Sequence, residues 1–191
     1  TGAAPLEFMD HLGMPLRDGL SFVHASLVGA GLRDRIRLGC SGKITSGFDM
    51  ARVMALGADW CNAARGFMFA IGCIQAQHCH TGACPTGVAT QDPMRQRALD
   101  VTDKAERVQR FHDDTVKSLA EILAAAGLEA PRQLRPEHIM RRGADGRIYS
   151  FRELYPALRP GELLTGAAGT IFAPYWAMAS SSSFSPALED A

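Results

Sequence analysis

Apolar positions in the first forty residues change from a helical spacing to a two-residue alternation. Between residues 22 and 32, apolar side chains lie near helical spacing, which predicts a helix. Gly29 and Gly31 indicate where this helix ends, because glycine is common just past a helix C-terminus. Apolar side chains then alternate with polar or small ones, so residues 36–40 are predicted to form a short strand.

A polar turn and a second helix follow this strand. Residues 41–47 are polar and contain glycine, and Ser46 followed by Asp49 is typical of a helix N-cap. The helix is predicted to continue to Leu56, and the next apolar run, residues 58–63, predicts a second buried strand. Strand, glycine-containing loop, helix and strand is the order of a parallel β/α fold.

A long amphipathic helix is predicted in the second half of the chain. Asp103 with Glu106 fits a helix start, and apolar side chains recur on one face from Val108 to Ala126 before Gly127 ends the helix. Such a stripe is usually buried against a core, so we interpret it as a packing helix and not a functional one.

The C-terminal third has weaker patterns. Residues 128–164 mix short charged and apolar pieces and are interpreted as a C-terminal extension. Residues 165–191 are rich in Ala, Ser and Gly and are expected to be a loose or disordered tail, because this composition buries little apolar surface. The longest apolar run there, Ile171 to Ala179, contains a proline and is too short to span a bilayer.

Composition and charge narrow the class of protein. The 191 residues are 47% hydrophobic and 21% charged, which is ordinary for about one globular domain. Lys and Arg total 20 and so do Asp and Glu, so no net charge attracts the chain to nucleic acid or to an anionic membrane. No signal segment opens the chain, and the cytoplasm is the expected location. The chain begins at Thr1 without a methionine, so we expect a segment of a longer protein.

Three of the five cysteines lie within twelve residues. Cys73, Cys79 and Cys84 are separated by five and then four residues. Thiolates bind iron–sulfur clusters well, and a three-iron cluster takes one protein thiolate for each iron. Gly82 and Gly87 would relieve backbone strain in a tight ligand loop. The pattern therefore predicts an iron–sulfur site with these three ligands.

Two other interpretations of the cysteines stay open on spacing alone. The three thiols could be buried or unpaired without any metal. His78 or His80 could complete a zinc site, although the cysteine spacing differs from that of the short zinc knuckles. Cys40 and Cys61 fall in predicted strands and are interpreted as core residues.

Several segments resemble the glutamate synthase family. The stretch GCIQAQHCHTGACPTGVATQDP, from Gly72 to Pro93, is similar to the family's three-iron cluster loop. The segments TGAAP, DHLGMP, GLRDRIRL and SGKITSGFDMARVMALGAD occur upstream in the family's order. The resemblance covers Thr1 to Gly127 and is specific, because independent motifs agree in order and spacing.

The resemblance implies that residues 1–127 are the C-terminal part of an FMN-binding (β/α)8 TIM barrel. The cluster loop at residues 72–93 and helices would be appended to it. In such barrels a phosphate commonly binds the loops after the seventh and eighth strands, where glycine backbone and a basic side chain meet it. Without the resemblance, solvated turns would be the better interpretation of these loops. The implied residues are Ser41, Gly42 and Lys43, then Ala64, Arg65 and Gly66 in a second turn, with Gly2 from a loop beside flavin and 2-oxoglutarate.

The resemblance also implies the reaction of a glutamate synthase. FMN would deliver hydride to 2-iminoglutarate, made from 2-oxoglutarate and ammonia, and the 3Fe-4S cluster would relay the electrons. The donor would be ferredoxin or an NADPH-dependent reductase subunit, and an amidotransferase domain or subunit would supply the ammonia. His11 and His24 match family positions but are assigned no chemistry, and no catalytic residue is identified.

Two other functions fit the same residues. A related flavin subunit makes N-methylglutamate from glutamate and methylamine, and its substrate-selecting residues would lie largely on other barrel strands. A truncated, non-catalytic remnant that only holds a cluster is an alternative from another class. Half a barrel would expose sheet edges and core, so the isolated chain is expected to be poorly soluble.

Overall fold

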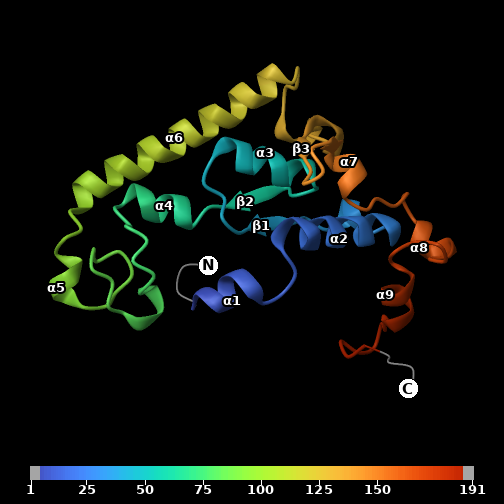
Figure 1. Ribbon diagram of the computed structural model, residues 1–191, viewed down its shortest axis with the longest axis horizontal. Helices are drawn as coiled ribbons and strands as arrows, with labels where there is room; N and C mark the ends of the chain where they lie inside the picture. The colour runs from blue at the N-terminus through green and yellow to red at the C-terminus, as the bar shows by residue number, and fades with distance from the viewer. Residues whose placement is uncertain (1–4, 187–191) are drawn as a thin grey trace.

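The computed structural model describes residues 5–186. In this part of the chain, helices surround two short sheets (Figure 1). The helices are α1 Leu6–His11, α2 Leu16–Gly29, α3 Gly47–Ala55, α4 Arg65–Ala70, α5 Pro93–Gln96, α6 Val101–Ala125, α7 Phe151–Leu154, α8 Glu162–Thr165 and α9 Ala173–Met178. The strands are β1 Gly39–Ser41, β2 Trp60–Asn62, β3 Met140–Arg142 and β4 Ile148–Ser150.

Strands β1 and β2 are parallel neighbours, and α3 connects them. Cys40 is paired with Cys61 in the register. Helix α3 begins as predicted, since the Ser46 side chain accepts a hydrogen bond from the Asp49 backbone N–H at 3.1 Å. The predicted strand–helix–strand order and the α/β class are confirmed. Among residues 5–186, β1 and β2 pair only with each other, so this part of the chain shows two parallel strands and no closed barrel.

The main core lies between the parallel strands, α3 and the long helix α6. Cys40 and Ala51 are 2% and 0% exposed and belong to the same buried cluster as Leu119 of α6. Helices α3 and α6 approach to backbone contact at Gly47, where a Cβ atom would lie 2.5 Å from the Leu119 nitrogen. The apolar stripe of α6 is therefore a packing surface, as the sequence predicted.

The C-terminal extension shares this core. Leu134, Ile139 and Phe151 are buried in the same cluster as the residues of α3 and α6. Strands β3 and β4 form an antiparallel pair. Ser150, at the end of β4, caps α7 by exchanging hydrogen bonds with Glu153. Residues 128–164 carry no strong sequence motif, yet they complete the packing around the parallel strands.

The expectation of a loose tail from Thr165 onward is corrected by the structure for the segment that contains α9. Phe172 is 2% exposed and stacks on Phe22 of α2, with ring centroids 4.9 Å apart. Tyr175 meets the same ring edge-on at 5.0 Å. Average composition was misleading here because a few aromatic side chains bury a large area each. The last five residues, 187–191, lie outside the described residues.

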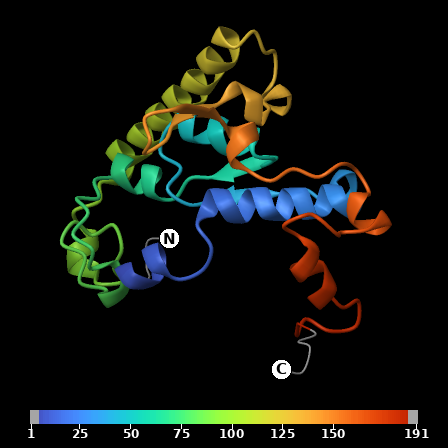
Figure 2. The ribbon, with the colours of Figure 1, turned by 45° about the vertical axis from the view of Figure 1, so that its right-hand side comes forward.

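The predicted cluster loop and the C-terminal helices lie at opposite ends of the molecule. Residues 72–93 and α5 lie beyond the first turns of α6, whereas α8 and α9 lie beyond the far end of α2 (Figure 1 and Figure 2). In the part of the chain that the structure describes, no helix combines the length and apolarity that crossing a bilayer requires.

Candidate functional site

A cleft of about 770 Å³ lies where β1 and β2 end. The loop after β1, the start of α4, one side of α3 and the loop before α2 form its walls. Four of the residues predicted to bind a phosphate, Ser41, Gly42, Lys43 and Arg65, line this one cleft. Parallel strands place the residues that follow them at the same edge, so this convergence is a consequence of the β/α topology.

The loop after β1 has an unusual backbone conformation. Gly42 has a φ of +151° and Lys43 has a φ of +51°. A Cβ atom on Gly42 would lie 3.1 Å from Leu16 Cδ2, so a side chain there would press on the wall of the cleft. A non-glycine residue in the left-handed region costs about 1–3 kcal/mol, and such strain is typical of sites that need a fixed loop shape.

The carboxylate of Asp49 holds the far end of this loop. Its Oδ2 accepts hydrogen bonds from the Thr45 backbone N–H at 3.1 Å, from Thr45 Oγ1 at 3.0 Å and from Ser46 Oγ at 2.8 Å. Its Oδ1 pairs with the guanidinium of Arg52. Burial would raise the pKa of Asp49, but the hydrogen bonds outweigh burial and lower it below the usual 3.8. Asp49 is therefore ionised at neutral pH.

The cleft carries more positive than negative charge. Its basic residues are Arg17, Lys43, Arg52 and Arg65, and its acidic residues are Asp18 and Asp49. Four positive charges against two negative ones favour an anionic ligand. Sequence reasoning did not assign Arg17, Arg52 or Asp49 to the site. The spacing of Ser46 and Asp49 was visible, but it indicated only a helix start.

Two other residues predicted for the phosphate site, Ala64 and Gly66, do not line the cleft. Ala64 is exposed and directly precedes α4. Gly66 is buried, and a Cβ atom there would lie 2.7 Å from Phe111 Cζ of α6, so its small size allows α4 to pack on α6. The prediction of a turn at Arg65 and Gly66 is wrong, because these residues begin α4. Gly2 lies outside the described residues.

The three predicted cluster ligands lie in one loop but are not assembled into a metal site. Cys73 and Cys79 are half-buried, and Cys84 is buried. Among the side chains that the structure describes, no three of His, Cys, Asp or Glu converge closely enough to hold a metal ion. Convergence of the three thiols around a cluster therefore stays a prediction.

The surroundings of Cys84 suit a thiolate. Thr86 Oγ1 lies 3.5 Å from the Cys84 sulfur, and the backbone N–H groups of Thr86, Val88 and Ala89 also hydrogen-bond to it. Burial raises the pKa of this thiol, but the hydrogen bonds lower it from 9.0 to about 7. Hydrogen bonds to the sulfurs are one of the means by which proteins tune iron–sulfur clusters.

The remaining cysteines belong to the core. Cys40 is buried, and Cys61 packs against the same apolar cluster. Burial raises the pKa of both thiols, and the neighbouring Cys40 helps to raise that of Cys61 to about 11. Both thiols are therefore protonated at neutral pH.

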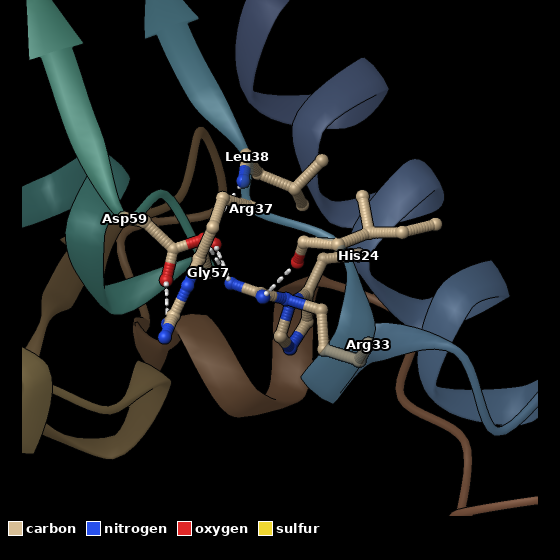
Figure 3. A network of polar contacts seen from close by, with 7 residues as sticks. His24, Arg33, Arg37, Leu38, Gly57 and Asp59 are labelled. Carbon is tan, nitrogen blue, oxygen red and sulfur yellow. Dashed lines mark hydrogen bonds and ion pairs between the residues drawn. The ribbon is translucent and has the colours of Figure 1, made fainter.

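A second polar cluster lies at the opposite ends of the two strands (Figure 3). Asp59 Oδ2 accepts hydrogen bonds from the Leu38 backbone N–H at 2.7 Å and from Arg33 at 2.8 Å. Arg33 also donates to His24 Nδ1 at 3.0 Å and to the Gly57 carbonyl at 2.8 Å. These contacts join α2 to the starts of both strands. His24 is thus part of a structural network.

Comparisons with known proteins agree with one another. A family model described as a conserved region in glutamate synthase matches residues 1–129. The chain is 41% identical over 154 residues to the glutamate synthase large subunit-like protein YerD of Bacillus subtilis, which covers 81% of this chain and 29% of that protein. It is 36% identical over 143 residues to the archaeal glutamate synthase [NADPH] of Methanocaldococcus jannaschii, covering 75% and 28%.

A third relative has a different electron donor in its name. The ferredoxin-dependent glutamate synthase of Pyropia yezoensis is 38% identical over 131 residues, which cover 68% of this chain and 8% of that protein. The chain spans less than a third of the length of these relatives.

Proposed function

Because this chain belongs to the glutamate synthase family, we propose that it forms the flavin-phosphate site and the iron–sulfur loop of a glutamate synthase-type oxidoreductase. The proposed reaction is FMN-dependent reductive amination of 2-oxoglutarate to L-glutamate. One observation carries the proposal: Ser41, Gly42, Lys43 and Arg65 line a single basic cleft at the ends of two parallel strands. Residues 1–127 would then be the C-terminal part of a (β/α)8 barrel.

The cleft suits a flavin phosphate in size and chemistry. The missing side chain of Gly42 lets the loop backbone approach phosphate oxygens. Lys43 and Arg65 supply positive charge, and a guanidinium can bind two phosphate oxygens at once. The volume of about 770 Å³ falls within the range of about 300–1,000 Å³ that is typical of ligand and cofactor sites.

The donor set of residues 72–93 suits a 3Fe-4S cluster. Its cysteines supply three thiolates, and Cys84 already receives several hydrogen bonds at its sulfur. Gln75 and Gln77, between the first two cysteines, have φ values of +57° and +60°, so this segment is strained. Cys73, Cys79 and Cys84 would hold the cluster, with one thiolate for each iron.

Each part of this chain would have a defined task in the reaction. When bound, FMN supplies hydride transfer to the imine carbon of 2-iminoglutarate, and the cluster supplies single-electron transfer. The chain's own residues hold the phosphate and the cluster and set the surroundings of both. Ferredoxin or an NADPH-dependent reductase would donate electrons, as the names of the relatives suggest for those proteins. An amidotransferase domain or subunit would supply ammonia.

The test is an anaerobic preparation of the longest natural form of the protein, analysed for iron, sulfide and flavin. We expect about three irons and bound FMN per chain, with a three-iron EPR signal in the oxidised sample. Cys79→Ser should abolish that signal, because it removes one ligand. Cys61→Ser, which alters a core thiol, should retain it. Zinc in place of iron, or neither metal nor flavin, would contradict the proposal.

A further inference from the structure

A single carboxylate joins the loop after β1 to helix α3. Asp49 Oδ2 accepts two hydrogen bonds from Thr45 and one from Ser46, between 2.8 and 3.1 Å long. On its other side, Oδ1 pairs with Arg52. Helix α3 is fixed in turn by its packing on α6, where Gly47 brings the two backbones into contact. The carboxylate therefore ties the loop to a rigid part of the core.

Capping of α3 does not account for all of these contacts. The cap needs only the hydrogen bond from the Asp49 backbone N–H to Ser46 Oγ. The two hydrogen bonds from Thr45 hold the loop itself. Thr45 lies two residues after Lys43, whose backbone is in the left-handed region. A strained residue of this kind persists only when the surrounding contacts over-determine its conformation. The Asp49 carboxylate supplies such contacts.

We propose that Asp49 is a positioning residue for the flavin phosphate. It holds residues 42–45 in the shape that presents their backbone and Lys43 to the cleft. Arg52 offsets its negative charge, which would otherwise repel a phosphate. The inference rests on the proposed function, because it assigns a role within the same phosphate site.

The test compares FMN with riboflavin, which lacks the phosphate, in the longest natural form of the protein. Asp49→Asn keeps the size of the side chain but has one acceptor oxygen, so it cannot serve both Thr45 and Arg52. We expect the affinity for FMN, measured by flavin fluorescence, to fall about tenfold, the effect of losing roughly one hydrogen bond. The affinity for riboflavin should stay unchanged.

Asp59→Asn is the matched control. It removes a carboxylate with a comparable set of hydrogen bonds at the opposite ends of the strands, so it should leave the ratio of FMN to riboflavin affinity unchanged. Equal losses for both flavins in Asp49→Asn would mean a merely structural role and would overturn the inference. If Asp49→Asn does not fold, Thr45→Val replaces it as the test variant. An unchanged ratio of FMN to riboflavin affinity in Thr45→Val would also overturn the inference.

Hydrogen exchange provides a measurement that needs no flavin. Amide exchange at residues 43–46 should be faster in Asp49→Asn than in Asp59→Asn if the carboxylate holds the loop. Equal exchange in the two variants would overturn the inference. A wild-type protein that binds neither flavin would contradict the proposed function itself, and the phosphate role of Asp49 would be rejected with it.

Discussion

The side chain of Arg33 joins several segments of the chain. Its guanidinium pairs with Asp59, donates to the Gly57 carbonyl and donates through Nε to His24 Nδ1. Because Nδ1 accepts this bond, His24 is neutral in the folded protein at neutral pH. Burial lowers the pKa of His24 below its usual 6.5, the charge of Arg33 lowers it further, and Asp59 opposes both effects.

We predict that His24 makes the protein less stable in mild acid. Below pH 6.5 the unfolded state binds a proton at His24 that the folded state does not yet bind. The contribution of neutral His24 to the free energy of unfolding is therefore complete above pH 6.5. It is lost as the pH falls toward the lower pKa that His24 has in the folded protein. Urea unfolding across this interval measures the effect. His24→Gln, which does not titrate, should lose less stability over the same interval, and identical pH profiles would contradict the prediction.

Glycines at the points where helices cross determine how closely those helices approach each other. Gly47 at the start of α3 faces the backbone of α6, and Gly66 at the start of α4 faces Phe111 of the same helix. Helix α6 is thus the support on which α3 and α4 are placed. These two helices carry Asp49 and Arg65 to the cleft.

Adding a methyl group at Gly47 should separate α3 from α6. In Gly47→Ala the new Cβ would lie 2.5 Å from the Leu119 nitrogen and 2.9 Å from the Ser118 carbonyl carbon, and backbone atoms cannot move aside cheaply. We expect a loss of about 1–3 kcal/mol in the free energy of unfolding, measured by chemical denaturation.

Gly19→Ala, inside α2, is the control for that substitution. A Cβ atom at Gly19 would meet only Met14, at 3.8 Å, which is ordinary contact. Alanine should be neutral there or stabilise the helix by up to about 1 kcal/mol. A similar loss of stability in both variants would show that the close approach at Gly47 is not the cause.

The candidate functional residues lie apart from the buried contacts that hold the C-terminal segment, which we call the C-terminal anchor. The cleft lies at the ends of β1 and β2, and the cysteine loop lies toward one end of the molecule (Figure 2). The buried contacts among Ala25, Leu163 and Phe172 lie toward the other end. A change at the anchor should therefore affect the C-terminal segment without affecting the cleft.

Phe172→Ala should release the segment that contains α9. The substitution removes a buried ring that stacks on Phe22, and the loss of stability should be about 3 kcal/mol. Limited proteolysis should cut the variant faster near the C-terminus, while FMN and iron contents stay at their wild-type values. Phe184→Ala, at a fully exposed ring, should behave like wild type. Equal proteolysis of all three proteins would count against the anchor.

Features that depend on short-range patterns could be predicted from the amino-acid sequence alone. The alternation in residues 36–40, the Ser46 cap and the apolar run of residues 58–63 predicted β1, α3 and β2. The stripe ending at Gly127 predicted α6. Motif order over residues 1–127 was enough to predict the family. These signals are reliable because helix and strand periods, caps and motif spacing are properties of neighbouring residues.

Contacts between residues far apart in the chain became visible only in the folded structure. In the folded structure Arg17, Asp49 and Arg52 line the cleft with Lys43. Gly66, which the local pattern placed in a turn, packs against α6. The fold also joins residues 128–164 to the core and Phe172 to α2. Composition and local spacing contain no information on such contacts, because they depend on how whole elements pack once the chain has folded.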